Sequence, residues 1–91
     1  MAWQPPKTMQ DGDQWTAPED YTLVGFCATV DPANGCAFSP KGSIGAYFEF
    51  YGGLGGAQAG WVTMMGLQLP IRKGQIYNQD GGTAVLYLTK P

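Results

Sequence analysis

The side chains that could support acid–base or metal chemistry are few and scattered in this 91-residue chain. A glycosidase needs two carboxyl groups that face each other across a cleft, yet only Glu49 lies within an expected strand. The other carboxylates lie in expected turns or in the N-terminal segment, where aspartate commonly stabilises turns. Histidine, the commonest general base and metal ligand, is absent from the sequence. We therefore expect a protein that is not an enzyme and needs no metal or cofactor. The carboxylates are Asp11, Asp13, Glu19, Asp20, Asp31, Glu49 and Asp80.

The two cysteines, Cys27 and Cys36, flank a segment with turn composition at 31–35. A hairpin around this turn would place them opposite each other, in position for a disulfide. The alternative is two buried free thiols, because cysteine is among the most buried residue types. Two cysteines without histidine cannot form a structural zinc site unaided, and a catalytic thiol needs a basic partner.

The stretch 52–60 is rich in glycine but does not have the pattern of a nucleotide-binding loop. It lacks the Gly-Lys-Ser/Thr ending of a phosphate-binding loop, and no helix is expected after it. Two interpretations remain: a simple connection between strands, or a loop at the tip of an adhesive domain, where glycine lets the backbone approach a ligand. Leu54 and Gln58 of this loop are candidate ligand or interface residues.

Composition narrows the classes of partner. The net charge is −2 and only 13% of the residues are charged, whereas nucleic acids and anionic membranes need clustered Lys and Arg. No stretch approaches the 18 or so apolar residues of a membrane span. The chain is 44% hydrophobic, which is enough to form a core. We therefore expect a folded domain that binds no nucleic acid and does not insert into a membrane.

The elements that must position these residues are strands. Turn signals recur along the chain, and no window shows the helical period. Asp80-Gly81-Gly82 is typical of a hairpin turn. The pattern favours an all-β fold, a small antiparallel β-sandwich or jelly roll. It would occupy residues 12–91, preceded by an extended lead-in at 1–11. The expected strands are 14–16, 21–30, 36–39, 44–51, 61–69, 75–79 and 83–89.

Within the strand expected at 44–51, alternation places aromatic and acidic side chains together. Tyr47, Glu49 and Tyr51 would share one face. This face is either a sugar-binding patch, with aromatic stacking and an acid that accepts hydroxyl hydrogen bonds, or a solvent face or subunit contact. Trp15 and Trp61 are interpreted as core or interface anchors rather than ligand platforms.

Chain length also bears on assembly. A domain of this size buries only enough apolar surface to offset, approximately, the entropy lost on ordering the chain. Burial between subunits would add stability, so we expect a homo-oligomer.

Two stretches taken together resemble the C-terminal tip domains of bacteriophage tail and head fibres. Those domains often contain "G-D-x-W/Y-T-A-P-x-D-G", then "L-P-V-x-K-G-D" and a closing "L-Y-F-x-P". Tyr21 stands where that family usually has Gly, and Gln75 where it usually has Asp. The resemblance covers most of residues 12–91 and implies a small jelly roll, similar to tumour-necrosis-factor-like heads, closed as a homotrimer. The matching stretches are Gly12-Asp13-Gln14-Trp15-Thr16-Ala17-Pro18-Glu19-Asp20-Tyr21 and Leu69-Pro70-Ile71-Arg72-Lys73-Gly74-Gln75-Ile76-Tyr77, with Thr83-Ala84-Val85-Leu86-Tyr87-Leu88.

The leading hypothesis from the sequence is a trimeric, non-enzymatic fibre domain of a phage virion, assembled in the cytoplasm of the host bacterium. It would attach to a glycan or protein of the bacterial surface. The alternatives are a structural virion component without a ligand of its own, such as a capsid decoration or fibre-assembly domain, and a monomeric carbohydrate-binding module.

Overall fold

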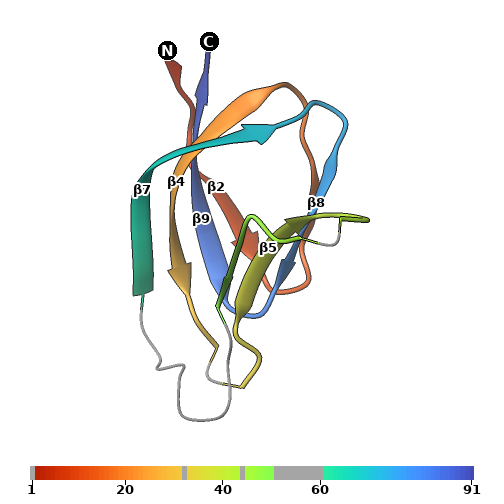
Figure 1. Ribbon diagram of the computed structural model, residues 1–91, viewed down its shortest axis with the longest axis vertical. Coiled ribbons are helices and arrows are strands. Elements are labelled where there is room, and N and C mark those ends of the chain that lie inside the picture. Colours follow the sequence, from red (N-terminus) through yellow and green to blue (C-terminus); the bar gives the residue numbers. More distant parts are fainter. Residues whose placement is uncertain (1, 32, 44, 51–60) are drawn as a thin grey trace.

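The computed structural model describes residues 2–31, 33–43, 45–50 and 61–91. Within these residues the chain forms nine β-strands and no helix (Figure 1). The expectation of an all-β fold is therefore confirmed. The strands are β1 (Ala2–Trp3), β2 (Lys7–Gln10), β3 (Gln14–Thr16), β4 (Tyr21–Thr29), β5 (Cys36–Pro40), β6 (Phe48–Phe50), β7 (Trp61–Ile71), β8 (Ile76–Asp80) and β9 (Thr83–Lys90).

The strands form two antiparallel sheets. The first sheet has the order β1-β9-β4-β7, with β2 also paired to β9, and the second has the order β3-β8-β5-β6. The pairs are nested: β2 with β9, β3 with β8, β4 with β7 and β5 with β6. The chain thus folds back on itself once, as one long hairpin wrapped into two layers. This strand order is that of a jelly roll.

Aromatic side chains join the two layers. The rings of Phe26 on β4 and Phe48 on β6 stack with centroids 3.8 Å apart. In the second sheet, Phe38 and Tyr77 stack at 5.4 Å, and both are fully buried. The first sheet adds alternate residues of β9, because Ala84, Leu86 and Leu88 all face the core. The strand expected at 83–89 is therefore present, with one of its two faces toward the core.

The N-terminal segment is part of the first sheet and is not a lead-in. Residues 7–10 pair with 83–86 of β9, and Ala2 pairs with Lys90, so the two chain ends lie side by side (Figure 1). Met9 is fully buried in the core. Its side chain fills the layer between the sheets, because Met9 lies opposite the buried Ala84.

Neither expected hairpin forms. β4 pairs with β7 and β9, whereas β5 pairs with β6 and β8, so the turn at 31–35 connects the two sheets. The Asp80–Gly82 turn likewise leads from β8 in one sheet to β9 in the other. Gly82 has φ +55, and a Cβ atom there would lie 1.9 Å from the carbonyl oxygen of Thr29. This close approach explains why glycine is needed at the crossing.

The two stretches that carry the fibre-tip resemblance lie against each other. The Gly74 N–H donates to the Ala17 carbonyl at 2.8 Å, and the Ala17 N–H donates to the Gln75 carbonyl at 3.0 Å. The Asp20 carboxylate accepts a 2.8 Å hydrogen bond from the Lys73 N–H. Gly74 has φ +82, a backbone angle that glycine adopts without strain. The residues of both stretches are therefore one structural unit that closes an end of the sandwich.

Candidate functional site

The outer face of the first sheet consists of uncharged residues. Directly paired residues of antiparallel strands point to the same face, so the register defines cross-strand rows on the side away from the core. None of the residues in these rows is charged, and five are threonines other than the buried Thr89. The rows are Trp3, Thr89, Thr22 and Pro70; Tyr87, Gly25 and Met65; Thr8, Val85, Cys27 and Thr63; and Gln10, Thr83, Thr29 and Trp61.

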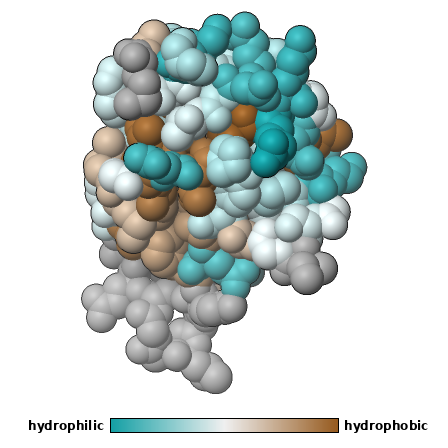
Figure 2. Space-filling model, turned by 45° about the horizontal axis from the view of Figure 1, so that its top comes forward, coloured by the Kyte–Doolittle hydropathy of each residue, from teal (hydrophilic) through white to brown (hydrophobic). Residues whose placement is uncertain are grey.

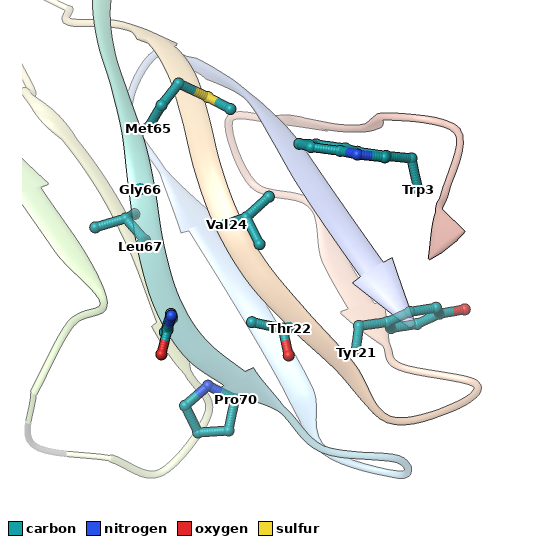
Figure 3. Close-up of a pocket in the computed structure, with 9 residues that line it drawn as sticks. Trp3, Tyr21, Thr22, Val24, Met65, Gly66, Leu67 and Pro70 are labelled. Carbon is teal, nitrogen blue, oxygen red and sulfur yellow. The ribbon is translucent and has the colours of Figure 1, made fainter. Parts of the chain in front are cut away.

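This face is hollowed where the register of β4 and β7 is irregular. One residue separates the paired positions Leu23 and Gly25 on β4, but three separate Met65 and Leu69 on β7. The extra residues form a bulge, a feature often found beside functional sites. A groove of about 660 Å³ lies here (Figure 3). The described residues that line it are Trp3, Tyr21, Thr22, Val24, Met65, Gly66, Leu67, Gln68 and Pro70.

The lining of the groove combines aromatic, aliphatic and neutral polar groups. The Trp3 side chain is 63% exposed, and its ring lines the groove together with Val24 and Tyr21 (Figure 3). The Tyr21 ring stacks on the ring of Trp15, which lies on β3 of the other sheet, with centroids 6.2 Å apart. Such a mostly apolar concavity with a few polar groups is the usual form of a small-molecule binding site.

Tyr47, expected to share an outer face with Glu49 and Tyr51, packs against the core instead. The Tyr47 hydroxyl donates a hydrogen bond to the Pro70 carbonyl, and its ring packs edge-on against Phe38 and Tyr77. Burial raises the pKa of Tyr47 to about 12, and the Tyr77 hydroxyl beside it contributes further. Tyr47 is therefore a packing residue. The alternation fails because β6 begins only at Phe48, so residue 47 precedes the strand.

The other predicted site residues are dispersed. Glu49 is exposed on β6, and Trp61, which is 60% exposed, lies on the outer face of the first sheet. Trp61 is thus no core anchor, whereas Trp15 is half-buried and packs against the core, as expected. Tyr51, Leu54 and Gln58 lie outside the described residues.

Glu49 has a carboxylate neighbour that the sequence pattern does not reveal. Glu49 and Asp80 both pair with Ala37, from opposite sides of β5, so the two carboxylates share the outer face of the second sheet. They border a second recess of about 340 Å³ together with Asn34. Among the described residues, no group of three or more His, Cys, Asp or Glu side chains could hold a metal ion.

The two cysteines are free thiols in different sheets. Cys27 lies on the outer face, where its sulfur accepts a 3.3 Å hydrogen bond from the Thr63 hydroxyl. Cys36 is buried and accepts a 3.1 Å hydrogen bond from the Gln79 side-chain amide. Burial raises the pKa of the Cys36 thiol, although this hydrogen bond opposes the shift. Of the two interpretations from the sequence, the buried free thiol holds for Cys36, while Cys27 is free but only partly buried.

Trp3 and Gln68 are groove residues that the sequence pattern did not single out. Trp3 lies in the segment expected to precede the domain, and its position depends on pairing with Thr89 of β9. The available signal is the presence of a large aromatic residue just before a segment, 7–10, whose central methionine is apolar among polar neighbours. That pattern is typical of a strand with one buried face.

Hydrophobic residues reach the surface in a band across the middle of the molecule, below a more hydrophilic end (Figure 2). In the described part of the chain, no helix has the length and apolarity required to cross a membrane.

Comparison with known proteins gives no match, whether with family models, curated proteins or solved structures.

Proposed function

We propose that this chain is a non-enzymatic fibre domain of a phage virion that forms a homotrimer and attaches to a glycan or protein of a bacterial surface. The observation that carries the proposal is the groove beside Trp3, an exposed and uncharged concavity on the first of two sheets. Binding sites of non-catalytic domains need such a preformed surface, and they need no reactive side chains.

The resemblance to fibre-tip domains supports the proposal through the contacts of its motif residues. Asp20 and Ala17 of the first stretch bind the backbone of Lys73 and Gly74 in the second. Ala17 is also buried. Each motif therefore has a partner in the other motif, which is what a shared scaffold requires. These residues support the fold, and the specificity for a receptor would come from other positions.

The proposal of a trimer is supported by β7. This strand is 11 residues long, lies at the edge of the first sheet and carries no charged residue between Trp61 and Ile71. Edge strands of proteins that stay monomeric are commonly protected by charges. Met64 on this strand is about half exposed. Burial of its side chain against a neighbouring copy would stabilise a chain of this size.

Trimerisation would also serve attachment. Three weak sites on one particle bind together through their effective concentration, so the overall avidity can exceed that of a single site by a factor of about 10² to 10⁴. The sites need only be presented so that all three reach the same surface.

Two measurements test this function. Multi-angle light scattering at micromolar concentration should give three times the 9.8 kDa chain mass. Sedimentation with whole bacteria should carry the fluorescently labelled protein into the pellet for a subset of strains. A monomer that binds sugars would favour a carbohydrate-binding module, an alternative that the aromatic groove itself favours. A trimer that binds no strain would favour a structural virion component.

A further inference from the structure

We infer that the groove beside Trp3 binds a neutral sugar, with the Trp3 ring stacked on the C–H face of the pyranose. This inference deepens the proposed attachment function and rests on it for its biological meaning. It concerns a site other than the face predicted from the sequence, because Tyr47 packs inward and Glu49 lies on the second sheet.

The charge of the groove selects the class of ligand. No described residue that lines the groove is charged, and the surrounding rows of the outer face are uncharged as well. A charged ligand would lose hydration there without gaining a partner charge. A neutral ligand is therefore the complementary one, and acidic sugars should be disfavoured.

The hydrogen-bonding groups of the groove match hydroxyls. The side chains of Thr22 and Gln68 line the groove and make no hydrogen bond to another residue of the described part. Gln68 offers two donors and an acceptor, and Thr22 offers one donor and can accept. A sugar hydroxyl can both donate and accept, so it can pair with either group.

The aromatic group of the groove is available for stacking. Trp3 is 63% exposed and makes no ring contact with the described residues. Its backbone is nevertheless fixed, because Trp3 pairs with Thr89 and the next N–H, that of Gln4, donates to the Leu88 carbonyl at 2.9 Å. An exposed ring on a fixed backbone is a stacking platform that loses little conformational entropy on binding.

The size of the groove fits a small ligand. Its volume of about 660 Å³ lies within the range of about 300–1,000 Å³ typical of small-molecule sites. Figure 3 shows Trp3, Tyr21 and Met65 arranged around Val24 and Thr22, so the apolar floor is bordered by rings and by a flexible thioether. Met65 also lies directly above Gly25, where a Cβ atom would collide with its sulfur.

The test is an NMR titration of the full chain with methyl glycosides of glucose, galactose and N-acetylglucosamine, and with glucuronic acid as the acidic probe. The three tryptophan indole N–H signals report separately on Trp3, Trp15 and Trp61. We expect a neutral glycoside to shift the Trp3 signal, with glucuronic acid at least tenfold weaker. The Trp3→Ala variant should bind at least tenfold more weakly, as expected for a central aromatic contact.

The matched control is Trp61→Ala, which removes a similarly exposed tryptophan from the same sheet face and should leave the affinity unchanged. Trp3→Phe keeps a ring and should retain part of the binding, which separates stacking from misfolding. The inference is overturned if no neutral glycoside shifts the Trp3 indole signal, or if glucuronic acid binds as tightly as the neutral glycosides. It is also overturned if Trp61→Ala, and not Trp3→Ala, weakens glycoside binding.

The failure of this inference and that of the proposed function are distinguishable. If the wild-type protein sediments with bacteria and Trp3→Ala does so equally, the attachment function stands and the sugar site is wrong. If glycosides bind at Trp3 but no bacterial strain retains the protein, the sugar site stands and the attachment function is wrong.

Discussion

The carboxylate of Asp20 accepts a 2.8 Å hydrogen bond from the backbone N–H of Lys73, 53 residues further along the chain. This contact joins the start of β4 to the turn between β7 and β8. Asp20→Ala should lower the free energy of unfolding by about 1 kcal/mol, because it leaves that N–H without its partner. Urea denaturation followed by fluorescence measures the change. Asp80→Ala removes a carboxylate with no hydrogen bond to the described residues, and should change the value by less than about 0.5 kcal/mol. Equal effects of the two variants would contradict this role of Asp20.

Gly82 is predicted to tolerate no side chain. Its φ of +55 opposes substitution, and so does the Thr29 carbonyl oxygen, which lies 1.9 Å from the position that a Cβ atom would occupy. Gly82→Ala should destabilise the fold by more than about 2 kcal/mol, since the backbone must move as well as adopt a strained angle. Gly12→Ala is the control: Gly12 has φ +86 with nothing within 4 Å, so only the cost of the angle applies. Thermal unfolding compares the stability of the two variants. A smaller loss of stability for Gly82→Ala than for Gly12→Ala would contradict the close approach of Gly82 to Thr29.

The two thiols should differ in their reactivity. Cys36 is buried, and burial raises the pKa of its thiol, so little thiolate is present at neutral pH. Cys27 is only partly buried on the outer face. Maleimide at pH 7.5 should modify Cys27 at least about tenfold faster than Cys36, which should react on unfolding. Peptide mass spectrometry over time gives both rates. Faster labelling of Cys36, or an intact disulfide in the untreated protein, would disprove the assignment.

Tyr47 should make the fold sensitive to alkali. The folded-state pKa is raised from the ordinary value of 10.0 to about 12, chiefly by burial. The phenol then stays protonated in the folded chain while it ionises in the unfolded chain. Its contribution is fully present below pH 10 and is lost as the pH rises from 10 through 12.

Tyr47→Phe isolates this effect. The variant loses the hydrogen bond to the Pro70 carbonyl and should be less stable by about 1 kcal/mol at pH 7. Between pH 10 and 12 its stability should fall less steeply than that of the wild type, because the titrating group is gone. Denaturant midpoints measured across this range test the prediction. Parallel pH profiles for the two proteins would show that Tyr47 ionises equally in the folded and unfolded chains.

A charge on β7 should separate the subunits of the proposed trimer. Met64 is about half exposed on this uncharged edge strand. Met64→Lys would place an ammonium group in the buried contact, where an unpaired charge is costly. Light scattering should then give the 9.8 kDa mass of one chain, while Thr8→Lys, on β2 at the far side of β9 from β7, should leave the trimer intact. A Met64→Lys variant that keeps the mass of the wild-type trimer would place the interface elsewhere.

Local patterns in the sequence determine most strands and their inner faces. The segment expected at 14–16 is β3 with the same bounds, and the strand expected at 83–89 lies within β9. Prediction and structure agree for these strands because strand composition and turn residues are local properties that a few neighbouring positions define. The strand expected at 44–51 is shorter, since β6 spans Phe48–Phe50. The preceding residue, Tyr47, is held by contacts with Phe38 and Tyr77 that no local pattern encodes.

Residue type and spacing are enough to predict that this protein is built of antiparallel strands with an apolar inner side. Which strands pair follows only from the three-dimensional fold. The turns at 31–35 and 80–82 have hairpin composition, yet both connect different sheets. The groove also depends on strand pairing. Trp3 and Pro70 both line it because they lie in one cross-strand row, connected through Thr89 and Thr22. Pairing over such separations is set by the total burial that the nested arrangement achieves, a sum over the whole chain that no short segment contains.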